Sequence, residues 1–317
     1  MVSPRRLRIL TWHVHGNYLY YLSQVPHTFI VPVSDRHGSG YGGLGGSLPW
    51  GDNMQEVPAS ELSKCQFDCI LFQSRRAYQE DQQVLLTEAQ RQLPRIYLEH
   101  DPPQLHPTNT PHPVDDPGML LVHVTHFNAL MWDNGRTPVQ VIEHGVKLLG
   151  EARWTGERAA AIAVVNELAR RGRRLGADVL DTVRREVPVD LVGMDSIASG
   201  GLGEIDNLAL PAFMARYRVY FHPARWTSLG LSAIEAMMVG LPVVGLASTE
   251  LSTVIRNGTH GYLATDPKQL IEAIAHLVSD PAEAARQGAA ARKLANERFS
   301  IRRFVADWLE TFDRVTR

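Results

Sequence analysis

The segment from Val219 to Gly261 holds the densest set of residues that could bind a ligand. It has the pattern of a strand, a loop, a helix that stops at Gly240, and a second strand. In a parallel sheet, ligands sit at the carboxyl ends of strands, where a helix N-terminus offers N–H groups to phosphate. Gly230 permits close approach of the backbone to a ligand. Glu235, one turn into the helix, can accept hydrogen bonds from both hydroxyls of a ribose.

A second candidate for phosphate binding lies after the apolar run 160–165, where Arg170, Arg171, Arg173 and Arg174 cluster. A guanidinium can grip a phosphate through two hydrogen bonds. Only four of the 32 basic residues are lysines, so any phosphate-binding cation is expected to be Arg. The alternative is a solvated helix start in an arginine-rich chain. Arg184 is expected to lie on the outer helix and to serve as a control.

Short apolar runs alternate with longer amphipathic stretches, which is typical of parallel sheets covered by helices. The expected strands are 7–14, 28–33, 67–72, 95–99, 120–124, 139–142, 160–165, 189–192, 219–221, 242–246 and 261–264. The clearest helices are 250–258, ending at an Asn-Gly stop, then 270–280 and 301–315. In the last of these, Phe304, Trp308 and Phe312 share one face, as in a core-packing helix.

Two irregular stretches interrupt the first half. Residues 37–51 form a glycine-rich loop, and residues 101–117 carry six prolines. Both are expected to be long loops, which in compact domains tend to bind ligands or act as lids. For the glycine-rich loop, an acceptor-side binding role and a disordered insertion both stay open.

The stretch LGLSAIEAMMVGLPVV resembles the donor-binding region of the GT4 family (glycosyltransferase group 1), retaining glycosyltransferases of the GT-B fold. Glu235 matches the family's ribose-binding Glu, and the loop residues Ser228, Leu229, Gly230 and Leu231 match its glycine-containing loop. The family's other Glu, which contacts the donor sugar, is replaced by Thr227. The resemblance implies that residues 227–231 and Glu235 bind a sugar nucleotide.

AIAVVNELARRGRRLGADVL resembles the family's diphosphate-binding element. Arg171-Gly172 stands where the family has Lys-Gly, which implies a catalytic cation at Arg171, while Glu167 falls where the family has Arg. Arg170, Arg173 or Arg174 could substitute for that displaced cation. The donor-binding residues implied around this element are Asn166, Arg170 and Arg171, with Gly193 and Met194 where related enzymes seat the nucleotide base.

In the first half the resemblance is weaker. Gly16, with His15 beside it, sits where the family has a glycine turn facing the acceptor. YLEHDPP resembles the family's strand-end His, which implies a catalytic His100 in the cleft between the lobes, close to the reacting sugar. For His13, His15, His123, His126 and His144 an ordinary structural role stays open.

The resemblance implies an α/β chain of two Rossmann-like domains facing each other across a cleft. We expect an acceptor-side domain over 1–150, a sugar-nucleotide domain over 151–300, and a terminal helix over 301–317 near or across the junction. The implied reaction moves a sugar from a nucleoside-diphosphate sugar to an acceptor, with retention and without metal or cofactor. Asp115-Asp116 lies in the proline-rich loop and is expected to face solvent.

Three other readings stay open. A sugar-nucleotide epimerase would act without an acceptor. A nucleotide-binding homologue with little or no activity would suit the replacements at Thr227 and Glu167. An oxidoreductase with two Rossmann-like lobes is disfavoured, because no glycine fingerprint follows the first strand.

Bulk properties bound the remaining possibilities. The 317 residues suffice for two domains. The net charge of −2 gives no global basic field for nucleic-acid binding. Cys65 and Cys69 are expected to be reduced, and no apolar run has the length of a signal peptide or membrane span. We expect cytoplasmic residence, with peripheral membrane contact left open, and a saccharide, lipid-linked or small-molecule acceptor.

Overall fold

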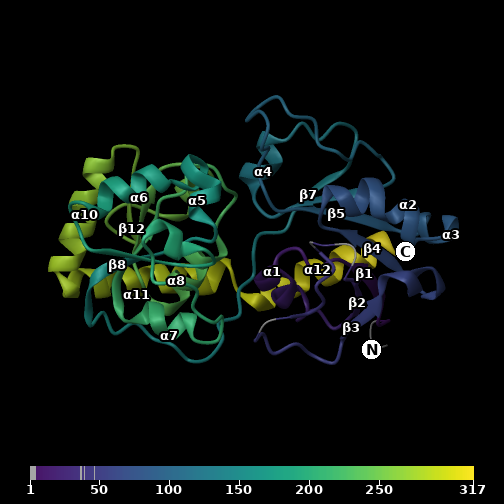
Figure 1. Cartoon of the computed structure of the whole chain (residues 1–317), viewed down its shortest axis with the longest axis horizontal. Helices are drawn as coiled ribbons and strands as arrows, with labels where there is room; N and C mark the ends of the chain where they lie inside the picture. Colours follow the sequence, from purple (N-terminus) through teal and green to yellow (C-terminus); the bar gives the residue numbers. More distant parts are fainter. Residues whose placement is uncertain (1–4, 36–37, 39, 46) are drawn as a thin grey trace. The chain divides into compact units, whose positions relative to one another are not determined.

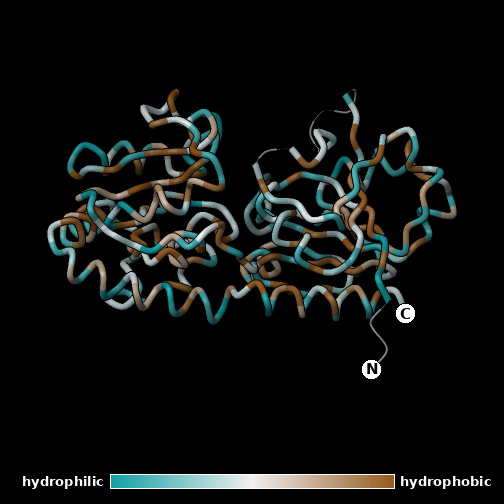
Figure 2. The backbone as a smooth tube through the Cα atoms, turned by 90° about the horizontal axis from the view of Figure 1, so that it is seen from below, coloured by the Kyte–Doolittle hydropathy of each residue, from teal (hydrophilic) through white to brown (hydrophobic). Residues whose placement is uncertain are grey.

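The computed structural model describes residues 5–35, 38, 40–45 and 47–317. The chain forms two compact units (Figure 1). Unit 1 comprises Met1–Gly145 together with Ile301–Arg317, and unit 2 comprises Val146–Ser300. Apolar residues are concentrated in the interior of each unit (Figure 2).

Unit 1 is built on a parallel sheet with the order β3-β2-β1-β4-β5-β6-β7. The strands are β1 (Arg8–Thr11), β2 (Thr28–Val33), β3 (Met54–Pro58), β4 (Cys69–Phe72), β5 (Arg95–Glu99), β6 (Leu120–His123) and β7 (Val139–Val141). The chain order reverses between β1 and β4. Residues that follow these two strands therefore lie at the point where doubly wound sheets bind ligands.

Six of these strands were predicted from apolar runs, and β3 was not. Strand β3 pairs only with β2 at the edge of the sheet, and Gln55 and Glu56 are exposed. An edge strand with polar exposed residues and a terminal proline lacks the continuous apolar run that marks a buried parallel strand.

The helical segments of unit 1 before residue 145 are short. They are α1 (Gly16–Leu22), the 3-10 helix η1 (Ala59–Lys64), the π-helical turn η2 (Ala77–Asp81), α2 (Gln82–Leu85), α3 (Glu88–Arg91) and α4 (His126–Met131). Helix α3 begins with a capping box between Thr87 and Gln90, which satisfies two backbone N–H groups at its start.

Helix α12 (Ile301–Val315) returns the chain to unit 1 and completes its core. Phe304, Trp308 and Phe312 are fully buried, which confirms the predicted packing face. The ring of Phe304 lies 5.6 Å from that of Tyr18 in α1. A partly buried polar contact also joins α12 to β7, since Gln140 Nε2 donates to Thr311 Oγ1 over 2.9 Å.

Unit 2 is built on a five-stranded parallel sheet with the order β12-β11-β10-β8-β9. Its strands are β8 (Arg158–Val164), β9 (Val189–Val192), β10 (Tyr217–His222), β11 (Val243–Leu246) and β12 (Gly261–Ala264), all of which were predicted. The reversal of chain order falls between β8 and β10. The two sequence segments expected to bind phosphate follow these two strands.

The helical segments of unit 2 surround this sheet. They are α5 (Leu168–Arg171), η3 (Gly172–Leu175), α6 (Ala177–Arg184), η4 (Ser196–Ser199), α7 (Leu210–Ala215), α8 (Leu231–Val239), α9 (Leu251–Val254), α10 (Pro267–Ser279) and α11 (Pro281–Arg298). Helix α8 ends at Gly240, whose φ of 112° suits a residue without a side chain.

The helix predicted over 250–258 is wrong in length. Helix α9 ends at Val254, and Asn257 instead bridges the following turn. Its side chain donates to Leu263 O over 3.0 Å and accepts from Leu263 N over 2.7 Å. These bonds hold the turn against β12, so the Asn-Gly pair begins a strand connection and does not end a helix.

In the described part of the chain, Cys65 and Cys69 are both free thiols. None of the helices described here combines the length and apolar character needed to cross a bilayer.

We predict that Phe312→Ala lowers the free energy of unfolding by about 3–5 kcal/mol, because it empties a fully buried site in the core of unit 1. Urea denaturation measures this change. Arg302→Ala, on the exposed face of the same helix, is the control and is expected to change stability by less than about 0.5 kcal/mol. Equal effects of the two changes would contradict the packing role of α12.

Candidate nucleotide site in unit 2

The first part of the candidate site follows β8. Asn166 Oδ1 accepts a hydrogen bond from Met194 N over 2.9 Å, and Glu167 N donates to Met194 O over 2.7 Å. Gly193 lies against the end of β8, because a Cβ there would be 2.5 Å from Val165 O. The structure thus brings together Asn166, Gly193 and Met194, three residues expected to bind the donor.

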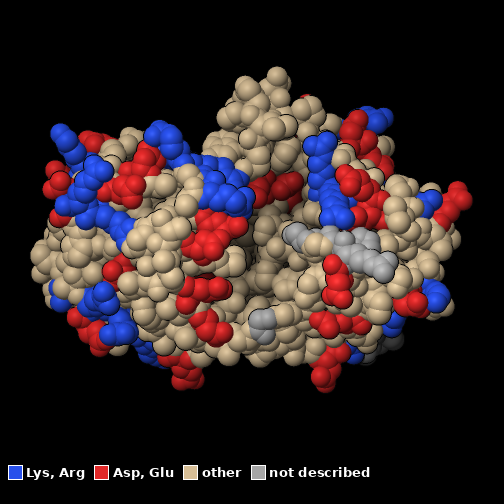
Figure 3. All heavy atoms as spheres, viewed as in Figure 1, with Lys and Arg blue, Asp and Glu red and all other residues tan. Residues whose placement is uncertain are grey.

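The arginine cluster covers helix α5 and the turn after it, and basic side chains gather over α5 and α6 on this face of unit 2 (Figure 3). Two of the arginines are engaged by carboxylates. Arg170 pairs with Glu167 through Nε at 3.0 Å and through Nη2, and this contact lowers the pKa of the Glu167 carboxyl. Arg173 Nη1 lies 2.5 Å from Asp178 Oδ2.

Arg174 differs from these neighbours. Its side chain is half-buried and has no hydrogen bond or ion pair with any residue in the described ranges. Its backbone carbonyl accepts hydrogen bonds from backbone N–H groups in the loop after β10. Arg174 is therefore a cation near the carboxyl edge of the sheet that no carboxylate among the described residues pairs with.

Arg184 lies in helix α6, as expected, but it is not a neutral control. Its guanidinium donates to the carbonyls of Val189, Ser199 and Gly200 over 2.7–3.2 Å. Arg184 thus ties α6 to the segment after β9, which gives it a structural role. Arg185, the next residue, is exposed and serves as a better control for the arginine cluster.

The second part of the site is the donor loop, defined here as residues 223–230, with helix α8 after it. Ser228 and Leu229 are buried, and Gly230 is the N-cap of α8. Ser232 Oγ lies 2.8 Å from Tyr220 Oη and donates to Val164 O over 3.4 Å. Helix α8 therefore begins at the carboxyl ends of both β10 and β8, with the N–H groups of its first residues at that edge.

Glu235 is almost fully buried in α8, with 6% of its surface exposed. Burial raises the pKa of Tyr220, and the nearby Glu235 charge raises it further. A buried carboxylate needs hydrogen-bond partners to offset its desolvation. Glu235 lies one turn after the start of α8, at the position expected for a ribose-binding residue.

The two parts of the site are directly joined. Arg225 N and Trp226 N both donate to Arg174 O, over 3.0 and 3.1 Å. Gly176 lies against the donor loop so closely that a Cβ there would be 2.0 Å from Pro223 O. The arginine cluster, the donor loop and the start of α8 thus share one edge of the unit 2 sheet.

His222 ends β10 beneath Gly230 and was not predicted as a site residue. A Cβ at Gly230 would lie 3.1 Å from His222 Cε1, and Gly245 makes room for the His222 Cβ. Within the described residues neither ring nitrogen has a hydrogen-bond partner. Burial lowers the pKa of His222 to about 4, so the ring is neutral at pH 7.

Candidate site residues in unit 1

His100 lies at the end of β5 and is fixed by Gln73, which follows β4. Gln73 Nε2 donates to Thr11 Oγ1 and Trp12 O, so its Oε1 is the acceptor for His100 Nε2 over 3.0 Å. Gln73 was not predicted as a site residue, because a single Gln after a strand matches no sequence motif. It connects the ends of β1, β4 and β5.

Other aromatic side chains surround His100. The His15 ring lies 4.2 Å from that of His100, and the Tyr18 ring lies 4.7 Å from it. Burial lowers the pKa of His100 well below its ordinary value, and His15 and His144 lower it further. The structure therefore brings the predicted residues His15 and His100 together, and the imidazole of His100 is neutral. Gly16 begins α1 directly after His15.

The glycine-rich loop is anchored where it is described. His13 Nδ1 lies 2.5 Å from Gly43 O, and Leu44 N donates to Glu56 Oε1 over 2.5 Å. Tyr41 is buried, and its hydroxyl donates to Asp81 over 2.7 Å. The loop thus passes beside the end of β1, while His37, Ser39 and Gly46 lie outside the described residues.

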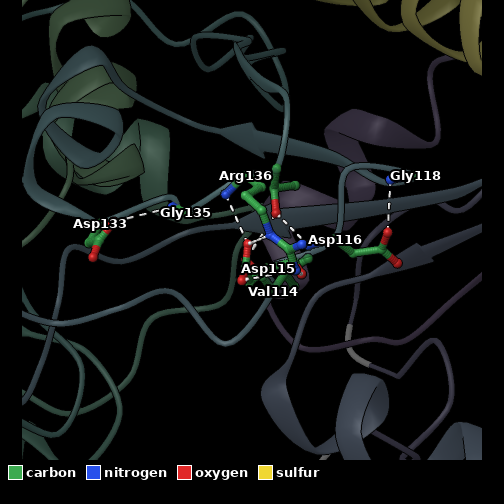
Figure 4. Close-up of polar contacts among 8 residues, drawn as sticks. Val114, Asp115, Asp116, Gly118, Asp133, Gly135 and Arg136 are labelled. Carbon is green, nitrogen blue, oxygen red and sulfur yellow. Dashed lines mark hydrogen bonds and ion pairs between the residues drawn. The ribbon is translucent and has the colours of Figure 1, made fainter.

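The acidic pair of the proline-rich loop has structural partners (Figure 4). Asp115 is exposed, as expected, and its Oδ1 accepts from both the backbone N and Nε of Arg136 over 2.9 and 3.0 Å. The expectation for Asp116 is wrong: it is half-buried, 3.0 Å from Arg95 Nη2, and accepts from Gly118 N. The described residues contain no group of three or more His, Cys, Asp or Glu arranged to hold a metal ion.

Comparison with known proteins relates unit 2 to a family. Residues 201–294 match the model described as Glycosyl transferases group 1. A stretch of 91 residues is 34% identical to an uncharacterized 41.2 kDa protein of the cps region of Klebsiella pneumoniae, over 27% of this chain and 25% of the relative. A stretch of 71 residues is 42% identical to D-inositol 3-phosphate glycosyltransferase 1 of Catenulispora acidiphila, over 21% and 17%. The matched stretches thus span a quarter or less of these relatives.

Solved structures match almost the whole chain. A sucrose-phosphate synthase from Thermosynechococcus elongatus has a TM-score of 0.72 at 14% identity, covering 98% of this chain and 99% of its own. The Anabaena HepE protein in complex with UDP-glucose has a TM-score of 0.68 at 15% identity, with 98% and 100% covered. TarM of S. aureus, in complex with UDP, has 0.61 at 18%, with 80% and 58% covered. These similarities establish the GT-B fold, with two Rossmann-like α/β units.

We predict that lowering the pH from about 6.5 towards 4 destabilises unit 2 partly through His222. The unfolded chain binds a proton there near pH 6.5, whereas the folded imidazole resists it until about pH 4, so stability is lost as the pH falls. A shift of this size corresponds to roughly 3 kcal/mol.

Thermal unfolding of His222→Phe between pH 7 and 4.5 measures this contribution, and a shallower loss of Tm than in the wild-type protein is expected. His276→Phe, an exposed position in unit 2, should leave the wild-type slope unchanged. An unaltered slope for His222→Phe would rule out its contribution.

Proposed function

We propose that this protein is a glycosyltransferase that moves a sugar from a nucleoside-diphosphate sugar to an acceptor. The observation that carries the proposal is the shared edge of the unit 2 sheet. There, basic side chains and the start of α8 lie beside the ends of β8 and β10, and the buried Glu235 is in the first half of α8. Cations and helix N-termini stabilise the charge that develops as a nucleoside diphosphate leaves.

The donor in this proposal has three separate contacts. Glu235 accepts hydrogen bonds from the ribose hydroxyls, and the first amides of α8 bind a phosphate. The base lies near Asn166, Gly193 and Met194, which the hydrogen bonds after β8 hold together. We propose uridine as this base, because the similar HepE and TarM proteins were determined with UDP-glucose and UDP.

Arg171 and Arg174 are the proposed diphosphate cations. Of the three substitutes considered for the displaced cation, Arg170 is paired with Glu167 and Arg173 with Asp178. Arg174 has no carboxylate partner among the residues described. With two guanidiniums on the diphosphate, transfer can proceed without a metal, and we propose retention of anomeric configuration by the family resemblance.

In unit 1 we propose that His100 binds a sugar hydroxyl as a neutral imidazole. Because its Nε2 donates to Gln73, its Nδ1 is the acceptor nitrogen. His15 and Gly16 contribute to the acceptor side. The acceptor is proposed to be a saccharide or another hydroxyl compound.

A second candidate function is nucleotide binding with little or no transfer. Thr227 occupies the position of a carboxylate that contacts the donor sugar in similar enzymes, and Glu167 neutralises Arg170. Binding would then persist while turnover is lost.

A thermal-shift screen of nucleoside-diphosphate sugars tests both candidates, since a ligand bound only by the folded state raises Tm. Donor hydrolysis and transfer to an acceptor panel are then measured with the best ligand. Binding with transfer supports the main proposal. Binding without transfer supports the second, and no binding by any sugar nucleotide contradicts both.

We predict that Glu235→Ala weakens binding of the nucleoside diphosphate more than tenfold, because the ribose hydroxyls lose their acceptor. Glu235→Gln, which keeps one carbonyl oxygen, should show an intermediate loss. Isothermal titration calorimetry measures both affinities, and Glu272→Ala on the exposed face of α10 is the control. An affinity equal to that of the wild-type protein would remove the ribose assignment.

Arg171→Ala is expected to lower turnover at least tenfold, because one cation is lost from the departing diphosphate. Steady-state transfer or donor hydrolysis measures the effect. Arg185→Ala, an exposed arginine just after α6, should retain wild-type turnover. If the two changes reduce turnover equally, the role of Arg171 is wrong.

A further inference from the structure

The contact between the donor loop and the turn 172–176 includes an ion-pair network that the nucleotide site does not explain. Asp178, in the first turn of α6, accepts hydrogen bonds from both terminal nitrogens of Arg225, over 2.5 and 2.8 Å. Arg173 Nη1 lies 2.5 Å from the same carboxylate. Arg225 Nη1 also donates to Arg173 O over 2.9 Å. One carboxylate thus joins the two segments.

The network reinforces the backbone contacts at the same place. Arg225 N and Trp226 N donate to Arg174 O, so the residue that holds Asp178 also fixes the position of Arg174. The donor loop then continues for only four residues to Gly230 and the start of α8. A displacement of Arg225 would therefore move both Arg174 and the α8 amides.

The network differs from an isolated surface ion pair. The side chains of Asp178 and Arg225 are 38% and 34% exposed, where an isolated pair contributes little to stability, whereas a carboxylate shared by two arginines can contribute more. A carboxylate held by both terminal nitrogens of one guanidinium also fixes geometry. The placement of the network, between two segments that must converge on one ligand, favours a role in positioning.

We propose that Asp178 is a positioning residue for the diphosphate site, holding the donor loop against the turn 172–176. In this arrangement the diphosphate meets Arg171, Arg174 and the α8 amides. This inference rests on the proposed function.

The same sheet offers a matched control. Arg216 Nε lies 2.6 Å from Glu157 Oε1, and these residues directly precede β10 and β8. The Glu157–Arg216 pair therefore spans the same two strands at the opposite, amino-terminal edge. Asp178→Asn and Glu157→Gln each remove one carboxylate charge from a partly exposed pair.

The test measures affinity for UDP by calorimetry in the full chain, with Tm recorded for each variant. We expect Asp178→Asn to weaken binding about tenfold, Arg225→Gln to weaken it similarly, and the double variant to lose no more than either alone. Glu157→Gln should bind as the wild-type protein does. Amide hydrogen exchange at residues 225–226 should also be faster in Asp178→Asn without ligand.

Each other outcome overturns the inference. Wild-type affinity in Asp178→Asn, or a loss of affinity in Arg225→Gln alone, shows that Arg225 acts without Asp178. Additive losses in the double variant show that the two residues act independently. Absence of UDP binding by the wild-type protein contradicts the proposed uridine base and the positioning role stated for UDP, and the proposed function itself fails only if no sugar nucleotide binds. The preceding results leave the proposed function intact.

Discussion

The parallel pairing of β8 with β10 is the constraint on which the candidate site depends. Val219 pairs with Ala161 and Tyr220 with Ile162, so both strands end at the same edge. Because chain order reverses between them, the connections that follow the two strands run to opposite sides of the sheet and leave a crevice between them. Hydrogen bonds from Arg225 N and Trp226 N to Arg174 O join the two connections beside this crevice. Local sequence supplies the groups, and strand pairing decides that they meet.

The same principle operates in unit 1 with different chemistry. There the reversal between β1 and β4 brings imidazoles and Gln73 to the strand ends, and Arg75 and Arg76 follow Gln73 just before η2. Burial keeps His100 neutral, since a charged imidazole would lose its hydration without a carboxylate partner nearby. Unit 2 thus brings arginines and helix amides to the edge of its sheet, and unit 1 brings a neutral imidazole bonded to Gln73 to the edge of its own.

Much of this arrangement could be predicted from the sequence. Each strand of unit 2 is a short apolar run, because both faces of a parallel sheet are covered, and the alternation with helices specifies the fold class. The donor loop was recognisable because Gly230 and Glu235 stand at fixed spacing from the start of one helix. Strand β3 escaped prediction because an edge strand need not be apolar.

The contacts that complete the site were beyond prediction for a different reason. Arg225 and Asp178 are 47 residues apart, and Gln73 and His100 are 27 apart. Nothing local distinguishes Asp178 from other acids in first turns of helices, or Gln73 from any polar residue after a strand. Such partners are identified only when the register of the sheet is known.

Helix α12 has a consequence for how the protein is made. Unit 1 is discontinuous in sequence, because its last element is separated from the rest by all of unit 2. Synthesis from the N-terminus therefore delivers Tyr18 and Phe29 long before Phe304 and Phe312, the side chains that cover them. Unit 2 can complete its core while translation continues, whereas unit 1 keeps an uncovered apolar surface until α12 has left the ribosome.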